Sequence, residues 1–487
     1  MRPHRYIVSL SLLAALALPQ AAQAVVKDCS ARTPGANLSF CSMRGVNLSG
    51  LDMHGASFVG ADLQGSNLSG SNLSGANLSS ANLAGTKFIG SNLQNAIISV
   101  SNLNNSNMTN ADLRGVFMYG ANVGGLAMGN AQLAGVSATA LYGIPSIMPY
   151  HWVMVGSSFL GPAAKVYGVN LRGYRLTSLD LRGADFTGSD LSYSNMSSTD
   201  LRGATLRNVK LTYTQMQDTR LDGLKSINVT GPPQKLQSGW KLLSGFLLGP
   251  TAVIQNAAIG HINLTGMNLS DADFSGSNLT GSQFDNTTLT NTLFTGSILS
   301  STSWSGAQLD KTNLDGANLT GAILAGSHST NLVGTPASLP DDWELREDGL
   351  AGPGADFRNL DLSGYNLSGL DLSDTLWSGA TITDLDLSGS TLDGARGYSL
   401  IGTPAALPGG WSVIGGLLLG SGAKLSDLDL HGLDLSGLTL DGVVFENSNL
   451  SGTNLTGASL TGADLSGANL SNADFSGANL TLSLIHI

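Results

Sequence analysis

The sequence predicts an all-β solenoid, a square coil in which four five-residue units complete each lap, with four hairpin-like inserts. Three observations lead to this prediction. A large apolar residue recurs at every fifth position, a small residue stands two positions before it, and the pattern changes frame at four interruptions of equal length. Self-similarity at a short fixed period is the sequence signature of repeat architectures. A solenoid also explains how 487 residues fold without one large core, because each unit touches only its neighbours.

The five-residue pattern is clearest in residues 38–133. Leu63, Leu68 and Phe88 are typical large residues, and Ala, Ser or Thr precedes each by two positions. Asp or Asn commonly stands between them, and Gly is common two positions later. We expect the large and the small residues to face inward, and the corner Gly to supply the positive φ of a type II turn. Leu68 and Phe88 should then lie over one another, one lap apart.

Residues 458–480 show the unit almost without fault, reading A-S-L-T-G, A-D-L-S-G, A-N-L-S-N, A-D-F-S-G and A-N-L. This A-(D/N)-L-(S/T/R)-G unit resembles that of the pentapeptide-repeat family. The resemblance covers most of the chain and implies a right-handed quadrilateral β-helix. It implies little about activity, because members of the family are functionally diverse.

Four inserts of one design separate five in-frame runs. The runs cover residues 36–135, 164–223, 252–326, 355–394 and 423–480, and the inserts cover residues 136–163, 224–251, 327–354 and 395–422. Each insert carries one Trp at a fixed offset, namely Trp152, Trp240, Trp343 and Trp411. The clearest copies open with G-T-P-A-S-L-P-D-D-W and G-T-P-A-A-L-P-G-G-W. A Pro-rich opening, a Trp and a short apolar stretch before a Gly predict a β-hairpin that leans on the coil.

The lengths of the runs predict where the inserts leave the coil. The second and fourth runs hold whole multiples of four units, whereas the third run is one unit short of such a multiple. The first and second inserts should therefore share one wall, and the third and fourth should share a neighbouring wall. The module resembles the Trp-containing insert of some large bacterial pentapeptide-repeat proteins.

The first residues read as an export signal. Residues 1–24 combine Arg2 and Arg5, an apolar stretch over residues 6–18 and a small-residue cleavage site at residues 22–24. The apolar stretch is too short to cross a bilayer. We therefore expect a periplasmic or extracellular protein without a membrane span after cleavage, and residues 25–35 are its candidate N-terminal cap.

Two cysteines, Cys29 and Cys41, follow the cleavage site closely. An oxidising compartment makes a disulfide between them plausible. Cys41 also stands two positions before Met43, where the pattern places a small inward residue, so the alternative is a simple core role.

Composition narrows the class of protein. Charged residues make up 12% of the chain and the net charge is −11, or −13 once Arg2 and Arg5 are removed with the leader. The surface must be mostly Asn, Ser and Thr, which argues against a nucleic-acid binder because such proteins neutralise phosphates with Lys and Arg. Some pentapeptide-repeat proteins resemble DNA in width and charge and inhibit topoisomerases. We keep this role as an alternative, although the charge is thin for it.

The search for chemistry predicts no catalytic site, no cofactor and no metal. The His residues are scattered, and His54 and His431 each follow a large apolar residue, so they should face solvent. One acidic edge could hold calcium in principle, although solvated turn residues are the commoner explanation. That edge consists of Asp427, Asp429, Asp434 and Asp441. An enzyme site between an insert and the wall is a second alternative, and the third insert carries the most acids for it, namely Asp341, Asp342, Glu344, Glu347 and Asp348.

We therefore expect a non-catalytic exported scaffold that presents flat polar walls to a protein, a glycan or an envelope component, in an oligomeric state that the sequence leaves open. The four Trp side chains are its candidate contact points. If they are buried against the coil, the inserts are only clips. Residues 481–487, T-L-S-L-I-H-I, lack the Asn, Asp and Gly of the pattern. We interpret them as the end of an incomplete reading frame, and the alternative is a short apolar tail that caps or dimerises.

Overall fold

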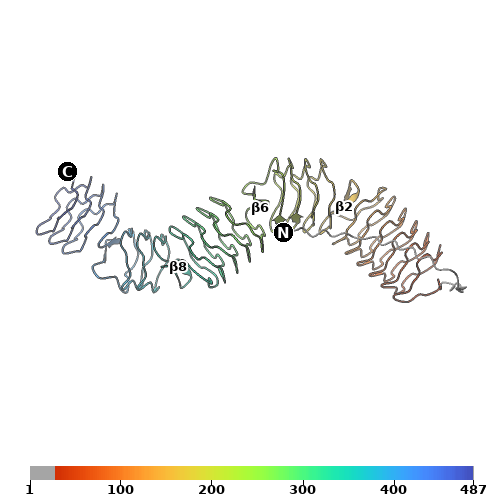
Figure 1. Cartoon of the computed structure of the whole chain (residues 1–487), viewed down its shortest axis with the longest axis horizontal. Coiled ribbons are helices and arrows are strands. Elements are labelled where there is room, and N and C mark those ends of the chain that lie inside the picture. Colours follow the sequence, from red (N-terminus) through yellow and green to blue (C-terminus); the bar gives the residue numbers. More distant parts are fainter. Residues whose placement is uncertain (1–27, 486–487) are drawn as a thin grey trace, which may run out of the picture. The chain divides into compact units, whose positions relative to one another are not determined.

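The structure is a computed structural model that describes residues 28–485. The signal peptide predicted at residues 1–24 lies outside the described residues, as do residues 25–27 and 486–487. Within the described part of the chain, no helix has the length and hydrophobicity that crossing a bilayer requires. Figure 1 shows the backbone as a series of flat coils. The described residues form two compact units, residues 28–133 with 140–149 and residues 134–139 with 150–485.

One ordinary lap of the coil contains 20 residues. Parallel bridges join each outward residue to the residue 20 positions later, as in Asn47↔Asn67 and Asn67↔Lys87. The Leu68 amide donates to the Lys87 carbonyl at 2.7 Å. Leu68 and Phe88 are both fully buried, in register one lap apart. The predicted lap of four five-residue units is therefore confirmed.

Polar inward residues are satisfied by the backbone of the coil. The Ser66 hydroxyl donates to the Met43 carbonyl at 2.6 Å, and the Thr86 hydroxyl donates to the Leu63 carbonyl at 2.8 Å. Such bonds remove the cost of burying a hydroxyl group. At the corners, Gly65 has a φ of 69°, and Asn105 reaches a φ of 56° where the pattern lacks Gly. Asn tolerates this left-handed conformation better than most residues do.

Each insert forms an antiparallel hairpin of two three-residue strands, as predicted. The pairs are β1 (Val153–Val155) with β2 (Ser158–Leu160), β5 (Lys241–Leu243) with β6 (Phe246–Leu248), β7 (Glu344–Arg346) with β8 (Gly349–Ala351), and β9 (Ser412–Ile414) with β10 (Leu417–Leu419). Two further strands, β3 (Thr205–Arg207) and β4 (Lys225–Ile227), pair in parallel on adjacent laps. Labels β2, β6 and β8 mark three of the inserts in Figure 1.

A lap that carries an insert contains 28 residues instead of 20. Lys225 bridges Val253, 28 positions later. The Val253 amide donates to the Leu224 carbonyl, and an equivalent backbone hydrogen bond with the same spacing closes the lap at each of the other three inserts. The predicted insert boundaries were too wide, because Tyr142 still bridges to a residue of the preceding lap although it lies within residues 136–163. Only the hairpin and its connections leave the coil.

The bridges also place the inserts on walls. One ladder runs through Lys165, Asp185, Thr205 and Lys225, and it joins the exit of the first insert to the start of the second. Another ladder runs through Asp356, Leu376 and Arg396, and it joins the third insert to the fourth. The third insert begins at His328, whose ladder leads back to Asn268, three units after Val253. The predicted pairing of the inserts on two neighbouring walls is confirmed.

The two ends of the described chain show one expected and one unexpected feature. Cys29 and Cys41 form a disulfide, with 5.7 Å between their Cα atoms, and Cys41 is at the same time a buried inward residue. The last run does not stop at residue 480 as predicted, because Leu484 bridges Asp464 in the ordinary register. The expectation was wrong because the lap needs only a small residue before a large one, and Ser483 and Ile485 supply them.

Candidate functional site

The insert tryptophans are not exposed contact points, which corrects the sequence-based expectation. Trp152, Trp240 and Trp343 are 7–9% exposed, and Trp411 is half-buried. The cause is a Gly nine residues after each Trp. A Cβ built on Gly161 would lie only 2.3 Å from the Trp152 ring, and the corresponding Gly residues of the other inserts are equally close to their indoles. Each indole therefore lies flat on backbone, and the inserts act as clips.

The walls of the coil carry ordered ladders of side-chain amides. The Asn122 amide donates to Asn102 at 3.2 Å, Asn102 donates to Asn82 at 3.3 Å, and Asn82 donates to Asp62 at 3.0 Å. The Asn122 side-chain oxygen also accepts from the Gly124 amide at 3.1 Å. These bonds hold each polar group at a fixed position, so the wall is a rigid, nearly uncharged array of hydrogen-bonding groups.

The acidic edge considered for calcium belongs to the same kind of ladder. Asp429 accepts from the Asn449 amide at 2.9 Å, and Asp434 accepts from the Asn454 amide at 3.0 Å. Asp441 accepts from the Ser459 hydroxyl at 2.5 Å. In the part of the chain that the structure describes, no group of three or more acidic, His or Cys side chains is arranged to hold a metal. The carboxylates stabilise the next lap instead.

The exposed His54 lies beside Asp52, with 3.0 Å between its Nδ1 and the carboxylate. His431 contacts Ser451 on the next lap at 2.6 Å. Both side chains are on the outside of the coil, as expected.

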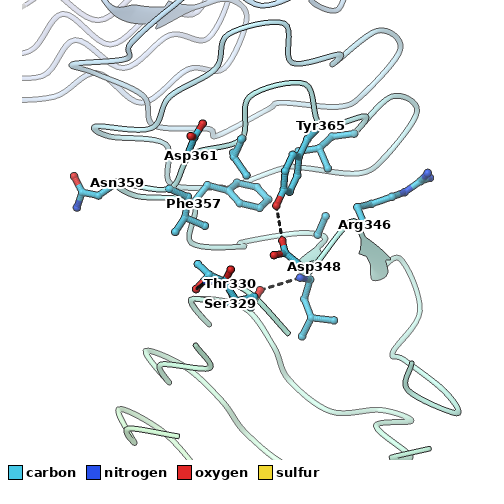
Figure 2. Close-up of a pocket in the computed structure, with 15 residues that line it drawn as sticks. Ser329, Thr330, Arg346, Asp348, Phe357, Asn359, Asp361 and Tyr365 are labelled. Atoms are coloured by element: carbon cyan, nitrogen blue, oxygen red, sulfur yellow. Dashed lines mark hydrogen bonds between the residues drawn. The ribbon is translucent and has the colours of Figure 1, made fainter. Parts of the chain in front are cut away.

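A crevice with polar and aromatic side chains lies beside the third insert, in the second unit (Figure 2). Its volume is about 220 Å³, and it lies between hairpin β7–β8 and the first lap that follows it. The Tyr365 hydroxyl donates to Asp348 across the crevice. The Leu350 amide donates to the Ser329 hydroxyl at 2.8 Å, which fixes the hairpin to the preceding lap. Phe357 lines the inner side, and its ring lies 4.6 Å from that of the buried Trp377.

Carboxylates determine the electrostatics of this crevice. Burial raises the pKa of Tyr365, and the hydrogen bond to Asp348 and the charges of Glu347 and Asp361 raise it further. Hydrogen bonds from Ser363 lower the pKa of Asp361. Arg346 pairs with Glu344 at 2.7 Å, and Figure 2 shows its guanidinium directed away from the tyrosine. The side chains that face the crevice therefore leave a net negative charge.

Sequence reasoning found part of this crevice. Of the five acids noted in the third insert, only Asp348 lines it, and Asp361 was missed. Tyr365 was also missed, although the sequence contained a signal for it. Tyr365 stands two positions before Leu367, where the pattern expects Ala, Ser or Thr, so an oversized residue occupies a small position in the lap beside the insert.

The charge is distributed unevenly along the chain, which the net charge alone does not show. Residues 164–251 contain 11 Lys and Arg against 6 Asp, whereas residues 252–487 contain 5 Lys and Arg against 24 Asp and Glu. The crevice beside the second insert reflects this difference. It measures about 170 Å³ and is lined by Arg207 and Lys225, with no acid. Counting charges run by run would have shown the asymmetry.

Comparison with known proteins supports the fold. A family profile described as pentapeptide repeats matches residues 35–70, 56–95, 99–125, 164–203, 190–223, 255–291, 289–326, 361–396 and 448–483, more than half of the chain. Proteins of this kind form right-handed quadrilateral β-helices, the architecture found here. No curated protein sequence matches this chain.

Several solved structures are similar to parts of the chain. HetL, a pentapeptide repeat protein involved in heterocyst differentiation regulation from the cyanobacterium Nostoc sp. strain PCC 7120, is 19% identical, with 61% of this chain and 92% of that chain covered and a TM-score of 0.18. QnrB1, a plasmid-mediated fluoroquinolone resistance protein, is 16% identical over 42% of this chain and 88% of its own, with a TM-score of 0.18. Rfr23 from the cyanobacterium Cyanothece 51142 is 18% identical over 35% and 91%, with a TM-score of 0.12. At these TM-scores none of the three bears on the function of this chain.

Proposed function

Because this chain belongs to the pentapeptide-repeat family, we propose that it is a non-catalytic exported scaffold that binds an extended, nearly neutral partner along its polar walls. The observation that carries the proposal is the amide ladder from Asn122 through Asn102 and Asn82 to Asp62. Hydrogen-bonding groups fixed in this way lose little conformational freedom when a partner binds, which reduces the entropic cost of association.

The composition of the ladder favours a glycan of the cell envelope over a charged polymer. The ladder presents amides and hydroxyls at the repeat spacing of the coil, and residues 28–163 carry 4 basic and 4 acidic residues. A surface without net charge has little electrostatic attraction for an anionic polymer. The leader predicted at residues 1–24 would bring the protein to the compartment in which such glycans occur.

Sedimentation with an insoluble envelope glycan fraction tests the proposal. Asn102→Lys would project a charged side chain from the middle of the ladder, and the coil tolerates Lys at an outward position, as Lys87 shows. We expect this variant to reduce the recovered fraction by at least half. Asn449→Lys makes the matched change in the wall of residues 423–480, and it tests whether that second wall also binds the glycan. Equal recovery of both variants and the wild type, or no recovery of the wild type above a blank, would contradict wall binding.

One observation favours a second candidate, a DNA-like decoy. Residues 252–487 contain 24 acidic and only 5 basic residues, so this part of the chain is far more acidic than the net charge of the whole chain suggests. Double-stranded DNA carries about one charge per 1.7 Å, which remains denser. A supercoiling assay with a purified type II topoisomerase tests this role, and an unchanged rate at a large excess of the protein would eliminate it.

A further inference from the structure

The geometry points to a binding site that is separate from the walls: we propose that the crevice beside the third insert binds a ligand through a primary ammonium group. Asp348 would hold the ammonium group and Tyr365 and Phe357 would contact the carbon frame that carries it, while the exposed Asp361 at the rim would add negative charge. The site lies where the β7–β8 hairpin meets the next lap. This site is additional to the proposed wall binding. Binding in the crevice does not require the amide ladder, so the two proposals can fail separately.

The crevice has the size and lining of a site for one small group. Its volume of about 220 Å³ suits a single sugar or an aliphatic amine more closely than a bare ion. Phe357 is 5% exposed and is supported from behind by Trp377, so the inner surface is apolar and firm. Tyr365 forms a second aromatic side. Aromatic faces attract ammonium groups and also pack against C–H groups.

The polar groups of the crevice are arranged for a cation. Tyr365 occupies one oxygen of Asp348, and Ser363 occupies one oxygen of Asp361. Among residues 28–485, no side chain is recorded as a hydrogen-bond or ion-pair partner of the second oxygen of either carboxylate. Thr330 and Asn331, which also line the crevice, donate instead to Asp310 at 2.8 Å and 3.1 Å. An ammonium group provides up to three donors for such oxygens, and charge-assisted bonds of this kind are strong.

The other copies of the module show that these residues are not needed to build a hairpin. In the fourth insert, 68 positions later, Gly416 and Leu433 correspond to Asp348 and Tyr365. In the second insert the corresponding residues are Gly245 and Ile262. The first insert has Ser157 and Tyr174, with no acid. Tyr174 of the first copy also lies against its hairpin turn, at Gly156, so the feature specific to the third copy is the acid that its tyrosine meets there.

The turn of the third hairpin carries a charged residue in a left-handed conformation. Glu347 has a φ of 50°, a left-handed conformation, and Ser244 of the second insert has a φ of 48° at the same place, whereas the first and fourth inserts have Gly156 and Gly415 there, both with a φ of 57°. A non-glycine residue in this conformation costs free energy. Retaining Glu there adds a third carboxylate near Tyr365, which reinforces the negative charge of the crevice.

Calorimetric titration of the protein at low salt tests the site. Glucosamine and Nα-acetyl-lysine amide are the two probes, because they carry the same ammonium group on a sugar and on an aliphatic chain, and N-acetylglucosamine is the neutral control. We expect at least one amine to bind in the millimolar range and the neutral sugar not to bind. Which amine binds more tightly identifies the frame that the crevice prefers.

Asp348→Asn should weaken amine binding about five- to tenfold, because the amide keeps the hydrogen bond from Tyr365 but removes the charge. Asp361→Asn is a second variant in case the first disturbs the hairpin. Asp429→Asn is the matched control, since Asp429 stands in the lap after the fourth insert where Asp361 stands in the lap after the third. The affinity of this control variant for the amine should equal that of the wild type. Failure of both amines to bind, equal binding of N-acetylglucosamine, or unchanged affinity in both crevice variants would overturn the proposal.

Discussion

In the coil, an apolar side chain is buried by its own counterparts in the laps above and below it, whereas in an insert the key apolar side chain is buried by a single glycine. Phe284 and Trp304 illustrate the first arrangement, because they stand 20 residues apart with their rings 4.5 Å from each other. Trp343 illustrates the second, because its indole covers Gly352. Both side chains end in the interior, but they depend on neighbours of very different kinds.

The difference shows where tolerance to substitution should lie. A ladder position has two similar neighbours, so a smaller apolar residue there weakens packing without removing it. The indole of an insert has one essential neighbour, and that neighbour must lack a side chain. The coil should therefore respond to loss of volume, and the inserts should respond to gain of volume.

The largest effect is expected in the coil, from Trp304→Ala. Trp304 is fully buried, and its indole N–H donates to the Thr302 hydroxyl at 2.7 Å. Removing a buried aromatic side chain of this size should reduce the free energy of unfolding by about 3–5 kcal/mol. Denaturant unfolding and hydrogen exchange of the neighbouring laps measure the loss. Leu293→Ala, on the outside of the same run, is the control and should change stability little. Equal losses for the two variants would mean that the ladder does not stabilise the coil.

A smaller loss of stability is expected in the fourth insert from Gly420→Ala, which adds volume instead of removing it. A Cβ at Gly420 would lie 2.2 Å from the Trp411 ring, so the indole must move. Overpacking of this kind costs about 1–3 kcal/mol. Tryptophan fluorescence and hydrogen exchange of β9 and β10 report the displacement. Gly409→Ala is a matched control, because a Cβ there meets nothing within 4 Å. If both variants behave alike, the indole is not held by the glycine.

The third insert should become more stable by Glu347→Gly. Glu347 has a positive φ that glycine adopts without strain, so relief of this strain should raise the free energy of unfolding by about 1 kcal/mol. The extra conformational entropy that glycine gives the unfolded chain offsets part of this gain. Thermal melting of the variant measures the gain. A loss of stability would show that the glutamate contributes a contact worth more than its backbone strain.

The smallest effect is expected at acidic pH, on the walls of the second run. A hydrogen bond from Arg182 holds the pKa of Asp180 below its usual value, and Arg202 does the same for Asp200. A carboxyl with a lowered pKa in the folded state stabilises the fold above the unfolded value near pH 4, and this contribution is lost as the pH falls through the folded value. Stability should therefore be constant from pH 7 to about pH 5 and decline below about pH 4. Arg182→Gln should make the decline shallower, and a decline that begins near pH 6 would point to histidines instead.

The sequence predicted the coil well because orientation in a strict repeat depends on position alone. Leu68 and Phe88 could be placed inside before any contact was known, and the walls that carry the inserts could be counted. The environment of Trp152 could not be predicted in the same way, because a hairpin has no repeat to orient its side chains. The interval from Trp152 to Gly161 was visible, but its meaning depends on how the chain returns to the coil. Likewise Tyr365 approaches Asp348 only through the hairpin, and the two are 17 residues apart in sequence.

The lap of 28 residues has a consequence for how the gene can change. Trp343 and Trp411 stand 68 positions apart, which corresponds to one long lap and two ordinary ones. Unequal recombination between these two copies would delete or duplicate whole laps and leave every remaining junction aligned. Trp240 and Trp343 are 103 positions apart, which is not a whole number of laps, so the same event between them would rotate everything downstream by one quarter of the square. Lineages of this protein should therefore gain and lose material within each pair of copies far more readily than between the pairs.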